Sequence, residues 1–317
     1  MDVLADVLRV IELSGGVFLE AEFSAPWNLS GRVSPDDCRA FMRAPRHIMG
    51  MHYVVSGRMR LQAEGGEAIE VGPGEVVLLP HNHAHLFGSA LDIPPIKAGD
   101  VVQPRPGDDL FRIVHGGGGA VTHVLCGYLG SDITFNPLLA VLPPVLTINA
   151  GALPSGKWIE TSFRLGADKT AASRQGAALA IARLAELLFV EAIQQFLAAL
   201  PGGGGGWLAG VRDPYVGRAL GLLHAQPTDK WTSESLAERV GLSRSAFAER
   251  FVSLVGQPPI QYLGVWRMHL AAQKLRSEHA RIAQVGFAVG YESEAAFSRA
   301  FKRQFGVSPD AWRRGTC

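Results

Sequence analysis

Between residues 282 and 312 the chain reads Ile-Ala-Gln-Val-Gly-Phe-Ala-Val-Gly-Tyr-Glu-Ser-Glu-Ala-Ala-Phe-Ser-Arg-Ala-Phe-Lys-Arg-Gln-Phe-Gly-Val-Ser-Pro-Asp-Ala-Trp. This pattern predicts a short helix, a turn at Gly290 and a second helix that carries Arg299, Lys302 and Arg303. Two helices joined by a tight turn form a helix-turn-helix, which commonly places its second helix in the major groove of DNA. The rest of the chain decides whether this motif stands alone.

The same pattern occurs a second time, nearer the N-terminus. The turn glycines Gly241 and Gly290 match at an offset of 49, and one extra residue near Glu292 shifts the offset to 50. Because glycine permits a turn and proline marks a helix boundary, matches of these residue types predict that one backbone geometry occurs twice. The pairs after the shift are Phe247 with Phe297, Phe251 with Phe301, Gly256 with Gly306, Pro259 with Pro309 and Tyr262 with Trp312.

Residues 260–276, between the two copies, have a helical pattern. A rigid helix here would fix the distance between the two recognition helices. Two such helices held about one turn of DNA apart would enter successive major-groove segments on one face of the duplex. The apolar positions that predict this helix are Tyr262, Leu263, Trp266, Leu270 and Leu275.

This paired arrangement resembles the AraC/XylS family of bacterial transcription regulators over residues 213–314. The resemblance implies a sequence-specific regulator, such as an activator, that binds double-stranded DNA. It also implies three further partners: RNA polymerase, a second copy in a homodimer and a small-molecule effector. The most specific matches are Ile282-Ala283, Gly290-Tyr291, Phe297, Phe301-Lys302, Phe305-Gly306, Ser308-Pro309 and Trp312-Arg313.

The two recognition helices offer candidate base-reading side chains. Ser243 and Ser293 are the expected N-caps. The phenylalanines of each helix are four residues apart and are expected to face the core, which turns the opposite side of each helix outward. The first copy presents Ser245, Ala248 and Glu249, which by the resemblance occupy base-reading positions, and the second presents Glu294, Ala295, Ser298 and Arg299.

Among these residues, Arg299 is the leading candidate because a bidentate contact from arginine to guanine is the commonest specific pairing. Glu249 can accept a hydrogen bond from N4 of cytosine. Arg244, Lys302 and Arg303 are expected to bind phosphate, which adds affinity without sequence information. The alternative for each basic residue is a solvated surface charge, and this is our interpretation of Lys274, Arg276 and Arg313.

Charge is divided unevenly along the chain. Residues 1–210 contain 15 Lys+Arg and 20 Asp+Glu, which gives a net charge of −5. Residues 211–317 contain 15 Lys+Arg and 9 Asp+Glu, which gives a net charge of +6. A basic block of this kind is typical of a nucleic-acid-binding domain, although drift of surface charge can produce the same pattern. The content of 47% hydrophobic and 19% charged residues indicates a globular protein.

The start of the chain, Met-Asp-Val-Leu-Ala-Asp, predicts no secretory signal. The most apolar helical stretch, 177–200, is interrupted by charged residues, so no membrane span is expected. The expected location is therefore the cytoplasm. The three scattered cysteines argue against a disulfide framework and fit a reducing compartment. They are Cys38, Cys126 and Cys317.

The N-terminal part has the clearest strand signal. Residues 51–90 contain short strand-like runs separated by glycine turns, which indicates an antiparallel barrel or sandwich. Residues 74–85 resemble the second half of a cupin motif, in which a glycine turn and a strand precede Pro-x-Gly-x-x-His. Here the chain reads Pro80-His-Asn-His-Ala-His85, and Asn82 replaces the glycine. Asparagine adopts positive φ more readily than most residues.

The expected fold is therefore multidomain, with an N-terminal antiparallel cupin-like β-barrel with flanking helices and a C-terminal all-α domain with two helix-turn-helix motifs. Residues 1–200 are predicted to sense an effector and are the candidate dimerisation domain. Residues 201–210 are predicted to form a glycine-rich linker, and residues 211–317 to bind DNA. A helix is expected over 176–200, and its apolar stripe suits either core packing or a dimer contact. The stripe contains Leu184, Leu187, Leu188, Ile193, Phe196 and Leu197.

Seven of the ten histidines lie between residues 47 and 123. Cupins often hold a metal with two or three histidines, and by this resemblance a zinc or other divalent metal site is one interpretation. However, no His-x-His precedes Gly57, where the first cupin motif is expected. In the other interpretation the histidines line the mouth of an apolar pocket or form local hydrogen bonds. The candidate metal or ligand residues are His47, His52, His81, His83 and His85, and no cofactor is certain.

Two cysteines are candidate redox sites, because some cupin-type regulators of the AraC/XylS family respond to oxidants. Cys126 lies in a strand-like run, where a buried structural thiol is the alternative. Cys38 lies in a polar stretch near Arg39 and is expected to be the more reactive thiol.

These patterns favour a regulator that is controlled by a small molecule, a metal or an oxidant, rather than an enzyme. The alternative is a metal-dependent cupin enzyme with an attached DNA-binding domain. Such an enzyme needs three or four well-placed ligands, and the weak first cupin motif offers at most one good position.

Overall fold

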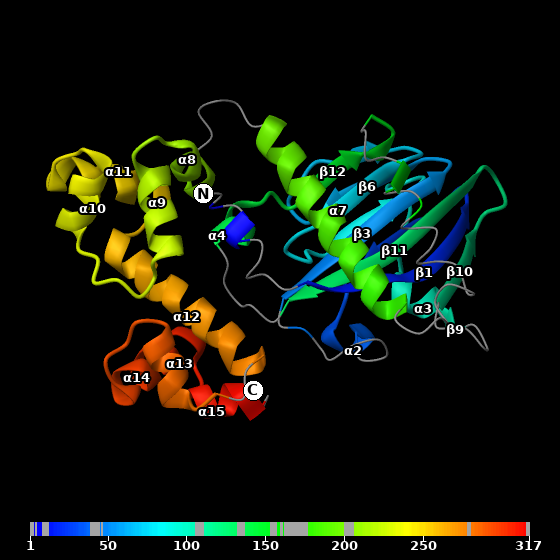
Figure 1. Ribbon diagram of the computed structural model, residues 1–317. Coiled ribbons are helices and arrows are strands. Elements are labelled where there is room, and N and C mark those ends of the chain that lie inside the picture. Colours follow the sequence, from blue (N-terminus) through cyan, green and yellow to red (C-terminus); the bar gives the residue numbers. More distant parts are fainter. Residues whose placement is uncertain are drawn as a thin grey trace. The chain divides into compact units, whose positions relative to one another are not determined.

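The computed structural model describes residues 3, 5–7, 13–38, 45, 47–104, 111–131, 137–152, 157, 158, 161, 177–199, 206–277 and 280–314. The chain forms two compact units, which are strand-rich and helical respectively (Figure 1). The β unit contains Glu12–Asp132 and Leu142–Ala199. The helical unit contains Met1–Ile11, Ile133–Val141 and Leu200–Cys317.

The β unit contains a seven-stranded sheet in the order β12-β6-β3-β11-β1-β10-β9 and a five-stranded sheet in the order β5-β4-β7-β2-β8. Most neighbouring strands are antiparallel, as predicted, but β1 pairs with β10 and β2 pairs with β8 in parallel. The strands are β1 Ser14–Ser24, β2 Asn28–Gly31, β3 His47–Ser56, β4 Met59–Ala63, β5 Ile69–Val71, β6 Glu75–Leu79, β7 His85–Gly88, β8 Ile96–Lys97, β9 Gln103–Pro104, β10 Phe111–Gly116, β11 Val121–Ser131 and β12 Leu146–Asn149, and two short helices are α2 Pro35–Cys38 and α3 Ala98–Val101.

Apolar side chains from both sheets form one core. Phe23 of β1, Leu29 of β2 and Leu61 of β4 are fully buried in it. Trp27 stacks on Phe23 at a ring-centroid distance of 4.0 Å, and the edge of Phe87 meets both rings. Each fully buried side chain of this size stabilises the fold by roughly 1.5–3 kcal/mol. The predicted N-terminal β domain is confirmed.

Asn82 occupies the glycine position of the motif with φ of 52°, in the left-handed region. Its side-chain Nδ2 donates to the Val33 carbonyl at 2.7 Å, and its Oδ1 accepts from the Val33 amide at 3.1 Å. Asparagine therefore satisfies the backbone geometry and also ties the turn to the segment after β2. Of the three histidines nearby, only His85 lies in a strand, so His81, His83 and His85 do not share one strand face.

Helix α7, Ala177–Ala199, agrees with the helix expected over 176–200, and it packs along β1 and β12. Its buried residues Leu188, Phe189, Ala192 and Ile193 face the β unit. The assignment of Leu187 to the apolar stripe is wrong, because this side chain is 52% exposed. It shares a helix side with Glu191 and Gln194, which lie one and two turns further along the helix.

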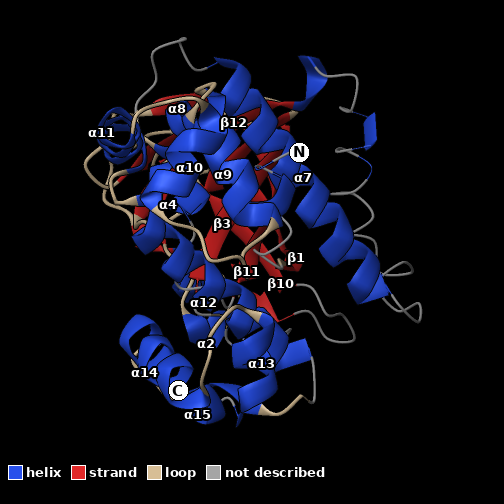
Figure 2. Cartoon of the chain, turned by 60° about the vertical axis from the view of Figure 1, so that its left-hand side comes forward, coloured by secondary structure: helices blue, strands red, loops and turns tan. Residues whose placement is uncertain are grey.

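The helical unit contains the predicted repeat. Its helix α12 runs between the α10–α11 pair and the α13–α14 pair (Figures 1 and 2) and agrees with the helix expected over 260–276. The short helix α8 was not predicted. The helices are α4 Pro137–Val141, α8 Trp207–Arg212, α9 Val216–Ala225, α10 Ser233–Val240, α11 Arg244–Val255, α12 Pro259–Ser277, α13 Ile282–Ala288, α14 Glu294–Phe305 and α15 Pro309–Arg314.

Two segments from the N-terminal part of the chain pack within the helical unit. Val3 is buried there, and a Cβ added at Gly221 of α9 would lie 3.8 Å from its side chain. Helix α4 packs against α8. Residues 201–205 of the predicted linker lie outside the described residues. The rest of that linker, 206–210, is not extended chain, because Gly206, with φ of 77°, precedes α8, and α8 includes residues 207–210. Among the described residues, no helix is long and apolar enough to cross a membrane.

Candidate nucleic-acid interface and effector cavity

The first recognition helix is α11, and its N-terminus is capped as predicted. The Ser243 hydroxyl accepts a hydrogen bond from the Ala246 amide at 3.3 Å. Phe247 and Phe251 are fully buried. Their rings meet edge to face at 5.6 Å. The candidate base-reading residues lie on the opposite side, where Ser245 and Glu249 are exposed and Ala248 is half-buried.

The second recognition helix, α14, repeats this arrangement. Ser293 accepts a hydrogen bond from the Ala296 amide at 3.2 Å. Phe297 and Phe301 are fully buried, and their ring centroids are also 5.6 Å apart. The outward residues are Glu294, Ala295 and Arg299, which are exposed, and Ser298, which is half-buried.

The candidate phosphate-binding side chains lie on the same two helices. Arg244 is the first residue of α11, and Lys302 and Arg303 lie in the last turn of α14. All three are exposed, and none forms an ion pair with another described residue. Their charges are therefore available to a polyanion. Their assignment to phosphate stays a prediction.

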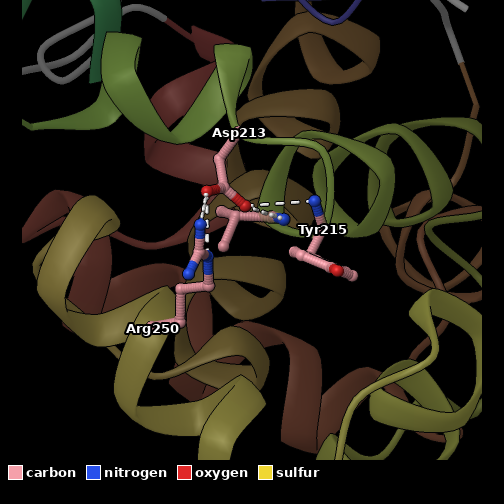
Figure 3. Close-up of polar contacts among 4 residues, drawn as sticks. Asp213, Tyr215 and Arg250 are labelled. Carbon is pink, nitrogen blue, oxygen red and sulfur yellow. Dashed lines mark hydrogen bonds and ion pairs between the residues drawn. The ribbon is translucent and has the colours of Figure 1, made fainter. Parts of the chain in front are cut away.

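Arg250, on α11, is exposed but forms an ion pair with Asp213. Its Nε and Nη2 donate to Oδ2 of Asp213 at 2.8 and 2.5 Å (Figure 3). The other carboxylate oxygen, Oδ1, accepts from the amides of Tyr215 and Val216 at the start of α9. Although burial alone raises the pKa of Asp213, the hydrogen bonds from Arg250 and the two amides lower it overall. This contact therefore fastens the first recognition helix to α9.

Arg267, on α12, joins the two copies. Its guanidinium donates to the carbonyls of Pro227 at 2.5 Å and Asp229 at 2.9 Å, in the segment before α10. It also reaches the Gly290 carbonyl, at 3.4 Å, in the turn of the second copy. A Cβ at Gly290, whose φ is 89°, would lie 3.0 Å from this guanidinium and from Cα of Thr228. Glycine is therefore required here by both the turn and the close approach.

Arg250 and Arg267 were not predicted from the sequence. The partners of Arg267 lie 23 to 40 residues away, so no local pattern marks them. Arg276 and Arg313, which were interpreted as surface charges, have structural contacts. Arg276 lies over the ring of Trp312 at 4.7 Å, and Arg313 donates to the Ala280 carbonyl at 2.6 Å.

The β unit contains a cavity of about 490 Å³ between its two sheets. Apolar side chains from both sheets form most of its wall, among them Phe23, Phe87 and Ile113. Uncharged polar side chains also line it, among them His52 of β3, His85 of β7 and Cys126 of β11. The carboxylates and guanidinium that border it belong to the exposed residues Arg32, Asp36 and Asp37.

Two of the five candidate histidines meet in this cavity. His52 Nε2 lies 2.9 Å from His85 Nε2, and its Nδ1 lies 3.1 Å from the Cys126 sulfur. Burial lowers the pKa of His52 and of His85, so both are neutral near pH 7. The other three lie apart from this pair. His47 and His81 border a second hollow, and the ring of His83 lies 5.4 Å from that of His81 in a tilted arrangement.

The described residues contain no group of three or more His, Cys, Asp or Glu side chains that could hold a metal ion. The His52–His85 distance is that of a hydrogen bond, and the second nitrogen of His52 is turned to Cys126. His85, His52 and Cys126 are therefore joined by hydrogen bonds.

The expectation that Cys38 lies in a polar loop is wrong, and which of the two thiols is the more reactive stays a prediction. Cys38 is the last residue of α2 and is fully buried. Burial raises the pKa of its thiol to about 11. Burial also raises the pKa of the Cys126 thiol, to about 12, but only Cys126 lines the cavity and contacts a histidine. The redox role of either cysteine stays a prediction.

Known proteins match both units. A family described as Cupin matches residues 2–198, and a helix-turn-helix domain family matches residues 236–315. An AraC-like transcription regulator of Streptomyces lividans is 33% identical over 99% of this chain and 98% of its own length. The transcriptional regulator AlkR of Acinetobacter baylyi is 29% identical over 99% of each chain. The RCS-specific activator RclR of Escherichia coli is 24% identical over 99% of this chain and 97% of its own length.

A helical unit with two capped helices that repeat one geometry, joined in one chain to a β unit with a cavity, indicates a DNA-binding helix-turn-helix protein with an added β domain. The relatives span the whole chain and are transcription regulators, not enzymes. The chain belongs to the AraC family of helix-turn-helix transcription regulators and has an N-terminal cupin domain. The predicted family, fold class and DNA partner are thereby confirmed, and the relatives favour the regulator over the enzyme alternative.

Proposed function

We propose that this protein is an effector-controlled regulator in which a small molecule enters the cavity of the β unit and changes how the helical unit engages its operator. The cavity carries this proposal, since its volume of about 490 Å³ lies within the usual range of small-molecule sites. Its apolar wall with a few convergent polar groups is also typical of such sites.

Base reading is divided between the two recognition helices. Arg299 would contact a guanine and Glu249 a cytosine, while Ser245, Ala248, Glu294, Ala295 and Ser298 would complete the two surfaces. Arg244, Lys302 and Arg303 would bind phosphates and set the register. The exposure of these side chains on the side opposite the buried phenylalanines supports this assignment.

The chain itself offers a route for the effector signal. Cys126, Gly127 and Tyr128 of β11 line the cavity, and β11 ends at Ser131. The next segment, Ile133–Val141, belongs to the helical unit, where its helix α4 packs against α8. A shift of β11 on effector binding would therefore be passed along the backbone to the helices that precede the first recognition helix.

Further partners follow from the family. We infer a homodimer, in which the exposed Leu187 side of α7 contributes to the contact, and an encounter with RNA polymerase at promoters in the bacterial cytoplasm. Control by an oxidant at Cys126 is a second form of regulation, which its contact with His52 supports. One relative is named an RCS-specific activator.

Genome-wide mapping of binding sites tests the proposed function. We expect a small set of sites near promoters that share one sequence pattern, and the neighbouring genes would indicate the class of effector. Arg299→Ala expressed at the same level should lose occupancy at these sites. Binding that is spread evenly along the chromosome and unchanged in this variant would contradict sequence-specific regulation.

A further inference from the structure

Cys126, His52 and His85 form an oriented chain of hydrogen bonds inside the cavity. Cys126 Sγ lies 3.1 Å from His52 Nδ1, and His52 Nε2 lies 2.9 Å from His85 Nε2. His85 Nδ1 in turn lies 3.1 Å from the His83 carbonyl oxygen. A thiol, a base within hydrogen-bond reach and a third group that orients the base together form the arrangement of an activated nucleophile.

The direction of this chain follows from its last member. A carbonyl oxygen only accepts hydrogen bonds, so His85 Nδ1 carries a proton and donates it to His83. Because His85 is neutral, its Nε2 has a lone pair and accepts from Nε2–H of His52. The Nδ1 atom of His52 is then unprotonated, and the Cys126 thiol donates to it. The proton of the thiol therefore already points at a base.

The surroundings of the thiol decide what can react with it. Packed atoms surround Cys126, but its side chain is only half-buried. Its open surface faces the cavity. The wall near it is built from Leu19, Phe23, Phe87 and Ile113. The charged side chains that border the cavity, Arg32 and two aspartates, are exposed. An uncharged and largely apolar molecule is therefore favoured.

We propose that Cys126 captures an uncharged, apolar carbon electrophile of the enone class covalently, with His52 as the proton acceptor and His85 as the residue that positions it. This inference rests on the proposed role of the cavity and names the chemistry of its effector. The cavity is far larger than a small inorganic oxidant requires, and its size suits an organic ligand.

The step is an addition that consumes no oxidant. The Cys126 sulfur attacks the β-carbon of the enone, an S–C bond forms and the C=C π bond breaks. Its electron pair moves toward the α-carbon and the carbonyl oxygen, while the thiol proton passes to His52 Nδ1. Transfer of that proton from His52 to the α-carbon completes a neutral adduct and restores the starting tautomer of His52.

Cys38 is an internal comparison for this reaction. Its thiol donates to the Ser34 carbonyl at 3.5 Å and is fully buried in α2. It does not line the cavity, and none of the histidine hydrogen bonds reaches it. Enone capture should therefore distinguish the thiol that lines the cavity from the thiol that is buried outside it.

The experiment treats the full-length protein with oct-3-en-2-one and follows intact mass, peptide mapping and DNA affinity. We expect an adduct at Cys126 and none at Cys38, and the Cys126 adduct should be absent in Cys126→Ser. General-base assistance contributes at least about 100-fold, so His52→Asn should slow the adduct by about that factor while remaining folded by circular dichroism. If His52→Asn fails to fold, His85→Gln, which removes only the positioning residue, should still slow the reaction.

Three outcomes would overturn the proposal: an adduct on Cys38, an unchanged rate in folded His52→Asn, or no adduct at Cys126. The saturated ketone octan-2-one separates this inference from the proposed function. If octan-2-one changes DNA affinity as strongly as the enone does, the cavity senses a ligand but covalent capture is wrong. A change in DNA affinity with the enone alone, lost in Cys126→Ser, would support both.

Discussion

The two helix-turn-helix copies have nearly the same framework and different outward faces. Each residue from 251 to 260 has the same degree of burial as the residue 50 positions later in the chain. The outward positions, in contrast, reverse their charge: Arg244 corresponds to Glu294, and Glu249 corresponds to Arg299. Packing therefore fixes one side of each helix and leaves the other side free to differ.

This difference assigns separate tasks to the copies. In the last turns of the recognition helices, Val252 corresponds to Lys302 and Ser253 to Arg303, so the second copy carries more positive charge. The first copy is instead fastened by Arg250 and Asp213, and position 300 has alanine in place of that arginine. We expect the second copy to supply more phosphate affinity and the first to contribute discrimination between sequences.

The largest expected effect concerns the common framework. Phe247→Ala and Phe297→Ala each remove a fully buried ring, and each should lower the free energy of unfolding of the helical unit by roughly 3–5 kcal/mol. Urea denaturation of the full-length variants measures this loss. Similar losses would support equivalent frameworks, whereas a loss in only one copy would contradict them.

The next effect concerns base reading. Arg299→Ala and Glu249→Ala should each cost about 1–3 kcal/mol on the specific site and relax the preference at one base pair, a guanine and a cytosine respectively. Binding to a DNA pool randomised at single positions measures both quantities. Equal losses on specific and random DNA would instead make these side chains general contacts.

A smaller effect is expected at the link between the copies. Arg267→Lys keeps the charge but loses the forked donors that join Pro227, Asp229 and Gly290. Affinity for the operator should fall roughly tenfold, since hydrogen bonds to charged groups contribute about 1.5–3 kcal/mol. Inserting one base pair between the half-sites should then weaken the variant less than the wild type. Arg276→Lys, outside this link, serves as the control.

The smallest effect concerns phosphate affinity. Lys302→Ala should reduce the slope of log affinity against log salt by about 0.9. Val252→Lys, at the matching position of the first copy, should increase the slope by about the same amount, since Val252 is also exposed. Fluorescence anisotropy over a range of salt concentrations measures both slopes. An unchanged slope in either variant would mean that this position does not face phosphate.

Much of the helical unit could be predicted because its signals are local. Ser243 and Ser293 cap the helices that follow them, and buried phenylalanines recur four residues apart. Positive φ at Gly241 and Gly290 marks both turns. Each of these features needs only residues that are close in sequence, so the pattern alone indicates the geometry.

The features that could not be predicted from the sequence depend on contacts between residues that are far apart in the chain. His52 and Cys126 are in contact although 74 positions separate them in the sequence. Arg267 contacts backbone carbonyls, which every residue type has, so its partners cannot be recognised from the sequence. Cys38 was placed in a polar loop because its neighbours are polar, but the end of α2 packs its thiol inward. Residues 1–11 and 133–141 belong to the helical unit, and no local sequence pattern predicts this.

The most direct test of the paired reader is guanine-N7 methylation protection on DNA that the full-length protein selects from a random pool. N7 of guanine lies in the major groove, where the recognition helices are expected to bind. Two protected clusters centred about 10–10.5 base pairs apart on one face of the duplex are the predicted result. A single cluster, or two clusters on opposite faces, would contradict the claim that α11 and α14 read successive major-groove segments.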